Sequence, residues 1–218
     1  VGHPLAKQIP RGLHIEVGKH SLGLSVTAKT IGLLPGSRSG EIGRLLPAML
    51  DAATLLLQQD EELVFLIPAI NALRAAQIHQ YLQSCPDNVR AAIRVFEATD
   101  SSGSIGRKVM AASDLVILAS GTATLEALLY TRPMIVVYRL HWLTFWLAKR
   151  MVKIESVSLP NILAGQKIVP ELIQHEVRGD TITAAAKALL PGHKAAYQQQ
   201  FQLDQIHARL QAGQAADA

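Results

Sequence analysis

The sequence contains very little cysteine and few aromatic residues. Its single cysteine, Cys85, has no second cysteine to pair with, so we expect a reducing, cytoplasmic environment without a disulfide framework. No uninterrupted apolar run reaches the length of about 18 residues that a membrane-spanning helix needs. The chain also lacks the basic and apolar start of a signal peptide. We therefore expect the chain to attach to one membrane surface at most.

Several chemical signatures are missing as well. The histidines have no partners at metal-ligand spacing, so no metal is expected. No Gly-Lys-Ser/Thr follows a glycine turn, which excludes a Walker-type ATP loop, and no nucleophile elbow supports hydrolase chemistry. We expect no cofactor.

The composition that remains is typical of a globular protein. Apolar residues make up 49% of the chain and charged residues 17%, which is enough to build one good core. The net charge of +4 and the pI of about 9.3 favour an anionic partner. They do not choose among a phosphate, a nucleic acid and an acidic membrane surface.

Short apolar segments alternate with longer segments of helical period, a pattern that predicts an α/β fold with a doubly wound parallel sheet. The expected strands are Thr30–Leu34, Leu63–Ile67, Ile93–Phe96, Leu115–Ala119 and Met134–Tyr138. The expected helices between them are Glu41–Gln58, Asn71–Gln83, Ile105–Ala112 and Thr122–Tyr130. Ligands bind such sheets beyond the carboxyl ends of the strands, so the turns near residues 35–40, 119–122 and 138–140 should share one rim.

The same pattern divides the chain into three parts. Residues 1–29 are interpreted as a lead-in from a missing N-terminal domain, residues 30–168 as a Rossmann-like domain and residues 169–218 as a C-terminal helical tail. The helices expected in the tail are Pro170–Val177, Asp180–Leu190 and His193–Leu210, and Gln211–Ala218 is expected to be frayed.

The first expected strand ends in a turn with two glycines, Leu-Pro-Gly-Ser-Arg-Ser-Gly-Glu over residues 34–41. The glycines let the backbone approach a ligand, and the amides at the start of the next helix attract an anion. Arg38 adds a forked donor for phosphate oxygens. An ordinary strand-loop-helix turn with a solvated arginine fits the spacing equally well.

The second turn, Ser-Gly-Thr-Ala over residues 120–123, leads into a helix that carries Glu126 one turn from its start. The amides of Gly121, Thr122 and Ala123 can bind a phosphate, and Glu126 can accept hydrogen bonds from two ribose hydroxyls. The alternative is that Thr122 caps the helix and Glu126 only complements its dipole. Two anion turns on one rim favour a nucleotide diphosphate.

Five stretches of the sequence together resemble lipid-A-disaccharide synthases. They are Leu-Leu-Pro-Gly-Ser-Arg with a following Glu-Ile, Ala-Ser-Gly-Thr-Ala-Thr-Leu-Glu-Ala, Pro-Met-Ile-Val-Val-Tyr-Arg, Ser-Leu-Pro-Asn-Ile-Leu-Ala-Gly and Val-Pro-Glu-Leu-Ile-Gln. They follow one another in this order between residues 33 and 174. The stretch over residues 158–165 makes the resemblance far more specific than a glycine turn does.

The resemblance implies the C-terminal, donor-binding domain of a GT-B glycosyltransferase. Such an enzyme transfers a hexosyl group from UDP-2,3-diacylglucosamine to 2,3-diacylglucosamine 1-phosphate, with inversion, and releases UDP in lipid A biosynthesis. The donor-site residues that it implies are Gly36, Ser37, Arg38, Glu41, Phe96, Glu97, Ser120, Gly121, Thr122, Ala123, Glu126, Tyr138, Arg139 and Asn161.

The implied roles differ among these residues. Arg38 and the amides of residues 121–123 would bind the diphosphate, and Glu126 would bind the ribose. The main chain near Phe96 and Glu97 would recognise uracil, and Asn161 would line the donor pocket. Tyr138 and Arg139 would face the sugar or phosphate, although Arg139 can equally act as a structural strut that pairs with Glu126 or Glu155.

The family's N-terminal domain, which supplies the acceptor site and the base, is absent from this sequence. The catalytic base is therefore unassigned, and this chain alone is expected to be inactive. The implied partners are the UDP-sugar donor, the lipid acceptor, the missing N-terminal domain and the anionic inner face of the cytoplasmic membrane. A homodimer through the C-terminal helices is also conceivable, and no nucleic acid is expected.

Residues 139–153 combine both tryptophans of the chain with a cluster of cations. On a helix, one face would carry Trp142, Trp146, Lys149 and Lys153. The hypothesis is contact with acyl chains or with an anionic membrane leaflet. The alternative is a core helix whose cations snorkel to the surface.

Two other readings stay open. One is a different UDP-sugar enzyme of the same fold, such as the peptidoglycan N-acetylglucosaminyltransferase or the non-hydrolysing UDP-GlcNAc 2-epimerase, which the stretch over residues 158–165 disfavours. The other is a non-catalytic nucleotide-binding or membrane-docking module. UDP binding separates the enzyme readings from a module that only docks on membranes.

Overall fold

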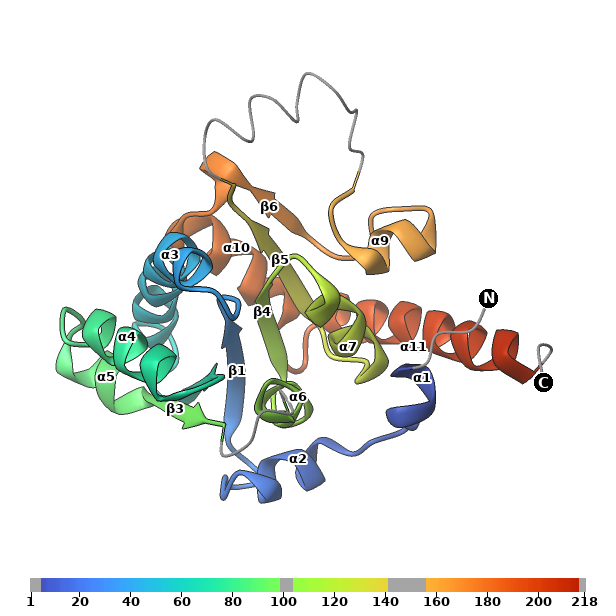
Figure 1. Cartoon of the computed structure of the whole chain (residues 1–218), viewed down its shortest axis with the longest axis horizontal. Helices are drawn as coiled ribbons and strands as arrows, with labels where there is room; N and C mark the ends of the chain where they lie inside the picture. Colours follow the sequence, from blue (N-terminus) through green and yellow to red (C-terminus); the bar gives the residue numbers. More distant parts are fainter. Residues whose placement is uncertain (1–4, 99–103, 141–155, 216–218) are drawn as a thin grey trace.

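The computed structural model of the chain describes residues 5–98, 104–140 and 156–215. A sheet of six parallel strands lies at its centre (Figure 1). The strand order is β3-β2-β1-β4-β5-β6, with every neighbouring pair parallel. The order reverses at β1, which confirms the predicted doubly wound sheet. The strands are β1 (Lys29–Leu34), β2 (Leu63–Ala69), β3 (Ile93–Glu97), β4 (Leu115–Ala119), β5 (Met134–Tyr138) and β6 (Glu171–Ile173).

Helices cover both faces of the sheet, because successive strand residues point to opposite sides. Ile31 and Leu33 of β1 point into one cluster of buried residues, and Leu34 points into the other. The helices of the first face are α3 (Ser39–Leu57), α4 (Ala72–Leu82), α5 (Asp87–Ala92) and α10 (Gly179–Leu189). Those that contribute buried residues to the second cluster are α1 (Leu5–Gln8), α6 (Ser104–Ala111), α7 (Thr122–Leu129) and α11 (Lys194–Ala215).

The predicted lead-in contains two helices in its described part, α1 and α2 (Ile15–Ser21). Both pack against the sheet domain: Ala6 of α1 is buried in the second cluster, and α2 lies against α6. The ammonium group of Lys19 is buried and lies 3.0 Å from the Asp114 carboxylate at the start of β4. Residues 5–22 are thus attached to the domain by apolar burial and by a charged contact.

The prediction of a helix over Pro170–Val177 is wrong. Glu171–Ile173 forms β6, a sixth strand that pairs with β5, and Gln174–Glu176 (η1) forms a single 3-10 turn. A three-residue edge strand is too short to show an alternating pattern, and Pro170 before it does not continue a helix. Gln174 has a positive φ of 55°, which breaks any helix at that point.

The other tail helices, α10 and α11, lie close to their predicted positions. The helix α11 continues to Ala215 and therefore includes residues that were expected to be frayed. The short helix α9 (Leu159–Ala164) was not predicted, because six residues with a proline near the start give little periodic signal. It ends at Gly165, whose φ of 67° suits the left-handed end of a helix.

Candidate donor site at the carboxyl ends of the strands

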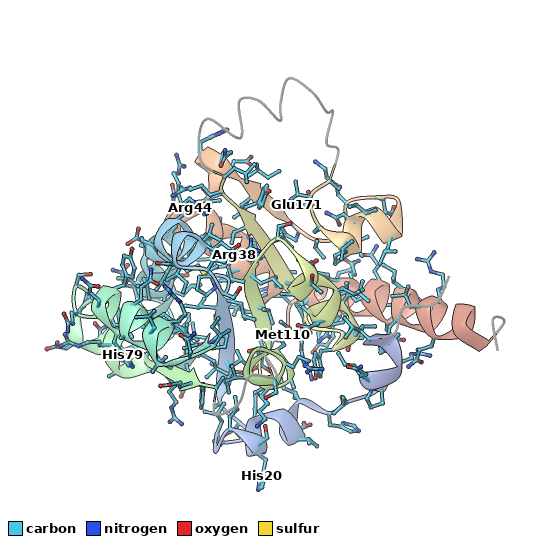
Figure 2. All side chains as sticks on the ribbon, viewed as in Figure 1. His20, Arg38, Arg44, His79, Met110 and Glu171 are labelled. Carbon is cyan, nitrogen blue, oxygen red and sulfur yellow. The ribbon has the colours of Figure 1, made fainter. Side chains whose placement is uncertain are left out.

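A cleft of about 420 Å³ opens beyond the carboxyl ends of β1, β2 and β4. This volume lies within the range of about 300–1,000 Å³ that is usual for small-ligand sites. In Figure 2, Arg38 at the start of α3 and Met110 on α6 mark two of its walls. The predicted residues that line it are Gly36, Ser37, Arg38, Glu41, Ser120, Gly121, Thr122, Ala123 and Glu126.

In the first turn, a side chain of the protein already occupies two backbone amides. The Glu41 carboxylate accepts hydrogen bonds from the amides of Ser37 at 3.2 Å and Arg38 at 3.3 Å. Gly36 makes this possible, since it adopts a φ of 105° and a Cβ there would lie 2.3 Å from a Glu41 carboxylate oxygen. While Glu41 holds these two amides, they are not available to a phosphate.

Arg38 remains available for a ligand. Its side chain is 85% exposed, and its guanidinium lies 3.7 Å from Glu41, which is a loose, solvent-screened ion pair. Because the guanidinium carries five donors in a planar fork, it can still bind phosphate oxygens bidentately. The first turn therefore contributes an exposed cation rather than a backbone cradle.

The second turn has free amides. Gly121 precedes α7 with a φ of 151°, and no side chain caps this helix. Among the described residues, no acceptor is bonded to the amides of Thr122 and Ala123, whereas the Thr124 amide bonds the Gly121 carbonyl. Thr122 therefore does not act as the cap that the alternative interpretation required. Unpaired amides at a helix start attract an anion, and these line the cleft.

Glu126 lies one turn into α7 and lines the same cleft. Partial burial raises the pKa of its carboxyl group above the ordinary value, and the positive charge of Arg107 opposes this shift. Among the described residues the Glu126 carboxylate has no ion-pair partner within 4.0 Å. A half-buried carboxylate without a partner beside free amides is an acceptor available to hydroxyl groups.

The raised pKa of Glu126 predicts that Glu126→Gln stabilises the ligand-free protein at neutral pH. The folded state binds the proton more tightly than the unfolded state, so wild-type stability falls as the pH rises through the folded-state pKa. Thermal unfolding at pH 4 and pH 7 checks this. The glutamine variant should melt at a higher temperature than wild type at pH 7, and most of this difference should disappear at pH 4. An equal difference in melting temperature at both pH values contradicts the prediction.

Five predicted residues lie outside the lining of this cleft: Phe96, Glu97, Tyr138, Arg139 and Asn161. Phe96 and Glu97 end the outermost strand β3, where Phe96 packs against the second cluster and Glu97 is exposed. Tyr138 ends β5 and is paired in register with Ile173. Their roles in binding uracil and sugar stay predictions.

Arg139 also lies outside the lining, and its contacts are those of a strut. Its guanidinium donates to three carbonyl oxygens, those of Gln174, Arg44 and Val177, while Arg44 donates back to the Arg139 carbonyl at 3.2 Å. Its partners are thus main-chain carbonyls of α3 and of the segment after β6. No pairing with Glu126 is present, and Glu155 lies outside the described residues.

Asn161 is buried, and its amide group is fully used within the protein. It donates to the Val169 carbonyl and to the Glu171 carboxylate, and its oxygen accepts from the amides of Ile168 and Val169. The Ser158–Gly165 stretch is thus bound to β6 through Asn161. The position of Asn161 in the donor pocket stays a prediction.

Some lining residues were missed by the sequence analysis. Leu34, Pro68, Ile70, Gly106, Met110 and Ala119 complete the walls of the cleft. Leu34, Pro68, Ile70 and Ala119 lie at or just beyond strand ends, so the rule that placed the turns on one rim also indicates them. Gly106 and Met110 have no such signal, because helix packing alone brings α6 to the cleft.

The residues Trp142, Trp146, Lys149 and Lys153, predicted to contact the membrane, lie outside the described residues.

Two absences hold for residues 5–98, 104–140 and 156–215. None of the helices in these parts of the chain is long and apolar enough to cross a membrane. Among the same residues, no group of three or more His, Cys, Asp and Glu side chains is arranged to hold a metal ion.

The family profile and the related sequences that match this chain all indicate one family. A family profile described as lipid-A-disaccharide synthetase matches residues 1–218. The lipid-A-disaccharide synthase of Acinetobacter baylyi is 43% identical over 217 residues, which cover 100% of this chain and 54% of that protein. That of Pseudomonas savastanoi is 46% identical over 221 residues, with coverage of 100% and 55%. The chain thus spans about half the length of the curated relatives it matches.

Comparison with solved structures supports the fold. The C-terminal domain of a group 1 family glycosyl transferase from Francisella tularensis matches with a TM-score of 0.60 and 12% identity, covering 94% of both chains. Alr3699/HepE of Anabaena, solved in complex with UDP and glucose, matches with a TM-score of 0.58 and 13% identity, covering 96% of this chain and 50% of that one. At these identities the likeness concerns the fold.

Proposed function

Because the chain belongs to the lipid-A-disaccharide synthetase family, we propose that its cleft is the UDP-sugar site of a lipid-A-disaccharide synthase. The complete enzyme transfers the acylated glucosamine of UDP-2,3-diacylglucosamine to 2,3-diacylglucosamine 1-phosphate and releases UDP. The observation that supports this most directly is that the free amides of residues 122 and 123 and the carboxylate of Glu126, which has no ion-pair partner among the described residues, line one cleft.

Each part of UDP has a chemical counterpart in the cleft. The diphosphate binds the start of α7 through the Thr122 and Ala123 amides, and Arg38, which lines the same cleft, donates to its oxygens. Glu126 accepts hydrogen bonds from the two ribose hydroxyls, since an ionised carboxylate has room for both. The apolar wall formed by Pro68 and Ile70 is suited to the flat face of the base.

These groups serve the departure of UDP. In the transfer, the acceptor hydroxyl oxygen forms a bond to the anomeric carbon, the bond between that carbon and the β-phosphate oxygen breaks, and UDP keeps the electron pair. Negative charge grows on the diphosphate at that moment, and oriented amides together with a guanidinium stabilise it. The acceptor hydroxyl loses its proton to a base that we place in the portion of the enzyme outside this sequence. The chain alone therefore binds donor without turning it over.

The test is calorimetric titration of the chain with UDP and with 2′,3′-dideoxy-UDP. Wild type should bind UDP more tightly than the dideoxy compound. Glu126→Gln should weaken UDP binding by about 10-fold, in line with the loss of charged hydrogen bonds, and leave the dideoxy compound almost unchanged. Absence of UDP binding at millimolar concentration, or an equal loss for both nucleotides, would contradict the assignment.

The remaining partners of this proposal follow from the family. We expect the enzyme to work at the anionic inner face of the cytoplasmic membrane, since both substrates are acylated. Contact through Trp142, Trp146, Lys149 and Lys153 stays a prediction, as do homodimer formation and docking of an N-terminal domain.

A further inference from the structure

A hydrogen-bond network lies beside the cleft, between β6 and α9. Its centre is Glu171, the first residue of β6, which Figure 2 shows on the side of the strand that faces α9. One carboxylate oxygen accepts from the Ser158 amide at 2.9 Å, the Ser158 hydroxyl at 2.5 Å and the Asn161 amide group at 2.9 Å. The other accepts from the Val157 amide at 3.2 Å.

This carboxylate is held by hydrogen bonds and not by a cation. Ser158 and Asn161 are buried, and among the described residues no Lys, Arg or His forms an ion pair with Glu171. Four donors that converge on one partly buried carboxylate fix its orientation, and the carboxylate fixes theirs in return. The main chain at Val157 and Ser158 is therefore held tightly against β6.

The same piece of main chain contacts the anion-binding turn. The Ser120 hydroxyl donates to the Val157 carbonyl at 2.7 Å, and the Ser120 amide donates to the Val137 carbonyl of β5 at 3.1 Å. Ser120 is therefore held from two sides, directly before Gly121 and the free amides of Thr122 and Ala123. Ser120 itself lines the cleft.

We propose that Glu171 is a positioning residue for the donor diphosphate, acting through the Val157–Ser158 main chain and the Ser120 hydroxyl on the turn at residues 120–123. The carboxylate touches no ligand. It sets the place of the Val157 carbonyl, which orients Ser120, and Ser120 in turn sets the direction of the amides that follow. The ligand named here rests on the proposed function.

A purely structural role would look different. If Glu171 only fastened α9 to the sheet, its replacement would lower stability and leave the Gly121–Ala123 amides as they are. The position of Ser120 distinguishes the two roles, because among the described residues its hydroxyl is the side-chain group that links the network to the cleft.

The experiment is a double-mutant cycle on UDP affinity with Glu171→Gln and Ser120→Ala. The glutamine keeps the shape of the side chain but turns one acceptor into a donor that faces N–H groups. We expect each single variant to bind UDP about 5- to 10-fold more weakly than wild type. In the Ser120→Ala background, Glu171→Gln should cost less than about 2-fold, because residues in one network couple.

The matched control is Glu176→Gln. Glu176 lies five residues further along, accepts from the Ile173 amide at 3.0 Å, is exposed and does not line the cleft. It should leave the UDP affinity unchanged. Thermal unfolding of every variant separates folding defects from binding defects.

A second measurement keeps the inference independent of UDP. In ligand-free protein, Glu171→Gln and Ser120→Ala should shift the same amide NMR signals of Gly121, Thr122 and Ala123, and Glu176→Gln should not. Additive losses of UDP affinity, or unmoved amide signals in Glu171→Gln, overturn the positioning role. If wild type binds no UDP, the proposed function fails, and the amide signals alone decide on the positioning role.

Discussion

Arg38→Glu is expected to weaken UDP binding by about 100-fold, which corresponds to about 2.7 kcal/mol. The guanidinium is the cation that the first turn offers to the cleft, since Glu41 occupies the Ser37 and Arg38 amides. Reversal of its charge replaces an attraction to the diphosphate by a repulsion of similar size, and it places a second carboxylate beside Glu41. Calorimetric titration with UDP measures the loss.

The control for this prediction is Lys187→Glu on the exposed side of α10, which makes the same change in net charge away from the cleft. It should alter UDP binding by less than about 2-fold, because exposed charges beyond a Debye length are screened. The difference in UDP affinity between the two variants should decrease as the salt concentration rises from about 20 to about 500 mM, as expected for partly exposed charges. Equal losses for both variants would refute a direct contact between Arg38 and the diphosphate.

The α/β alternation made the sheet predictable from the sequence. Buried strands such as β4 consist of continuous apolar residues, and the long helices between strands have a clear period. The shortest elements escaped this reasoning. The strand β6 has three residues at an edge of the sheet, and its backbone pairing with β5 is a tertiary interaction that no local pattern encodes.

The parts of the site that follow directly after a strand were predictable. The parts that depend on a side-chain hydrogen bond to another segment were less so. The rule of the common rim brought the turns at residues 36–41 and 120–126 into one cleft. The sequence could not indicate that Glu41 folds back onto the first turn, since the same Glu suits a helix start or a ligand. The contact between Glu171 and Ser158 joins residues 13 positions apart, and only the pairing of β6 creates it.

The Ser158–Gly165 stretch shows how a motif can be recognised without its role being understood. Its asparagine was expected to line the donor pocket, yet all four hydrogen-bonding positions of the Asn161 amide are used inside the protein. Substitution of this asparagine would leave several buried polar groups without a partner. The link of the stretch to the cleft passes through Val157 and Ser120.

Gly36→Ala is expected to destabilise the fold by about 3 kcal/mol and to lower the melting temperature by roughly 6–12 °C, given the scaling for a domain of this size. The new Cβ would lie 2.3 Å from a carboxylate oxygen of Glu41 and 2.9 Å from its Cβ, at a φ of 105° that an alanine rarely adopts. Glu41 would have to leave the Ser37 and Arg38 amides, and α3 would lose the carboxylate that caps its start.

The matched control is Gly23→Ala, which introduces the backbone strain of a positive φ without a steric clash of the new Cβ. Gly23 has a φ of 65° and no heavy atom within 4 Å of an added Cβ, so its replacement should cost only about 1–2 kcal/mol. The difference between the two variants, measured by urea unfolding, isolates the contact between Gly36 and Glu41. Equal costs would show that the turn accommodates a Cβ. The larger cost at Gly36 together with weaker UDP binding would tie the shape of the first turn to the placement of Arg38.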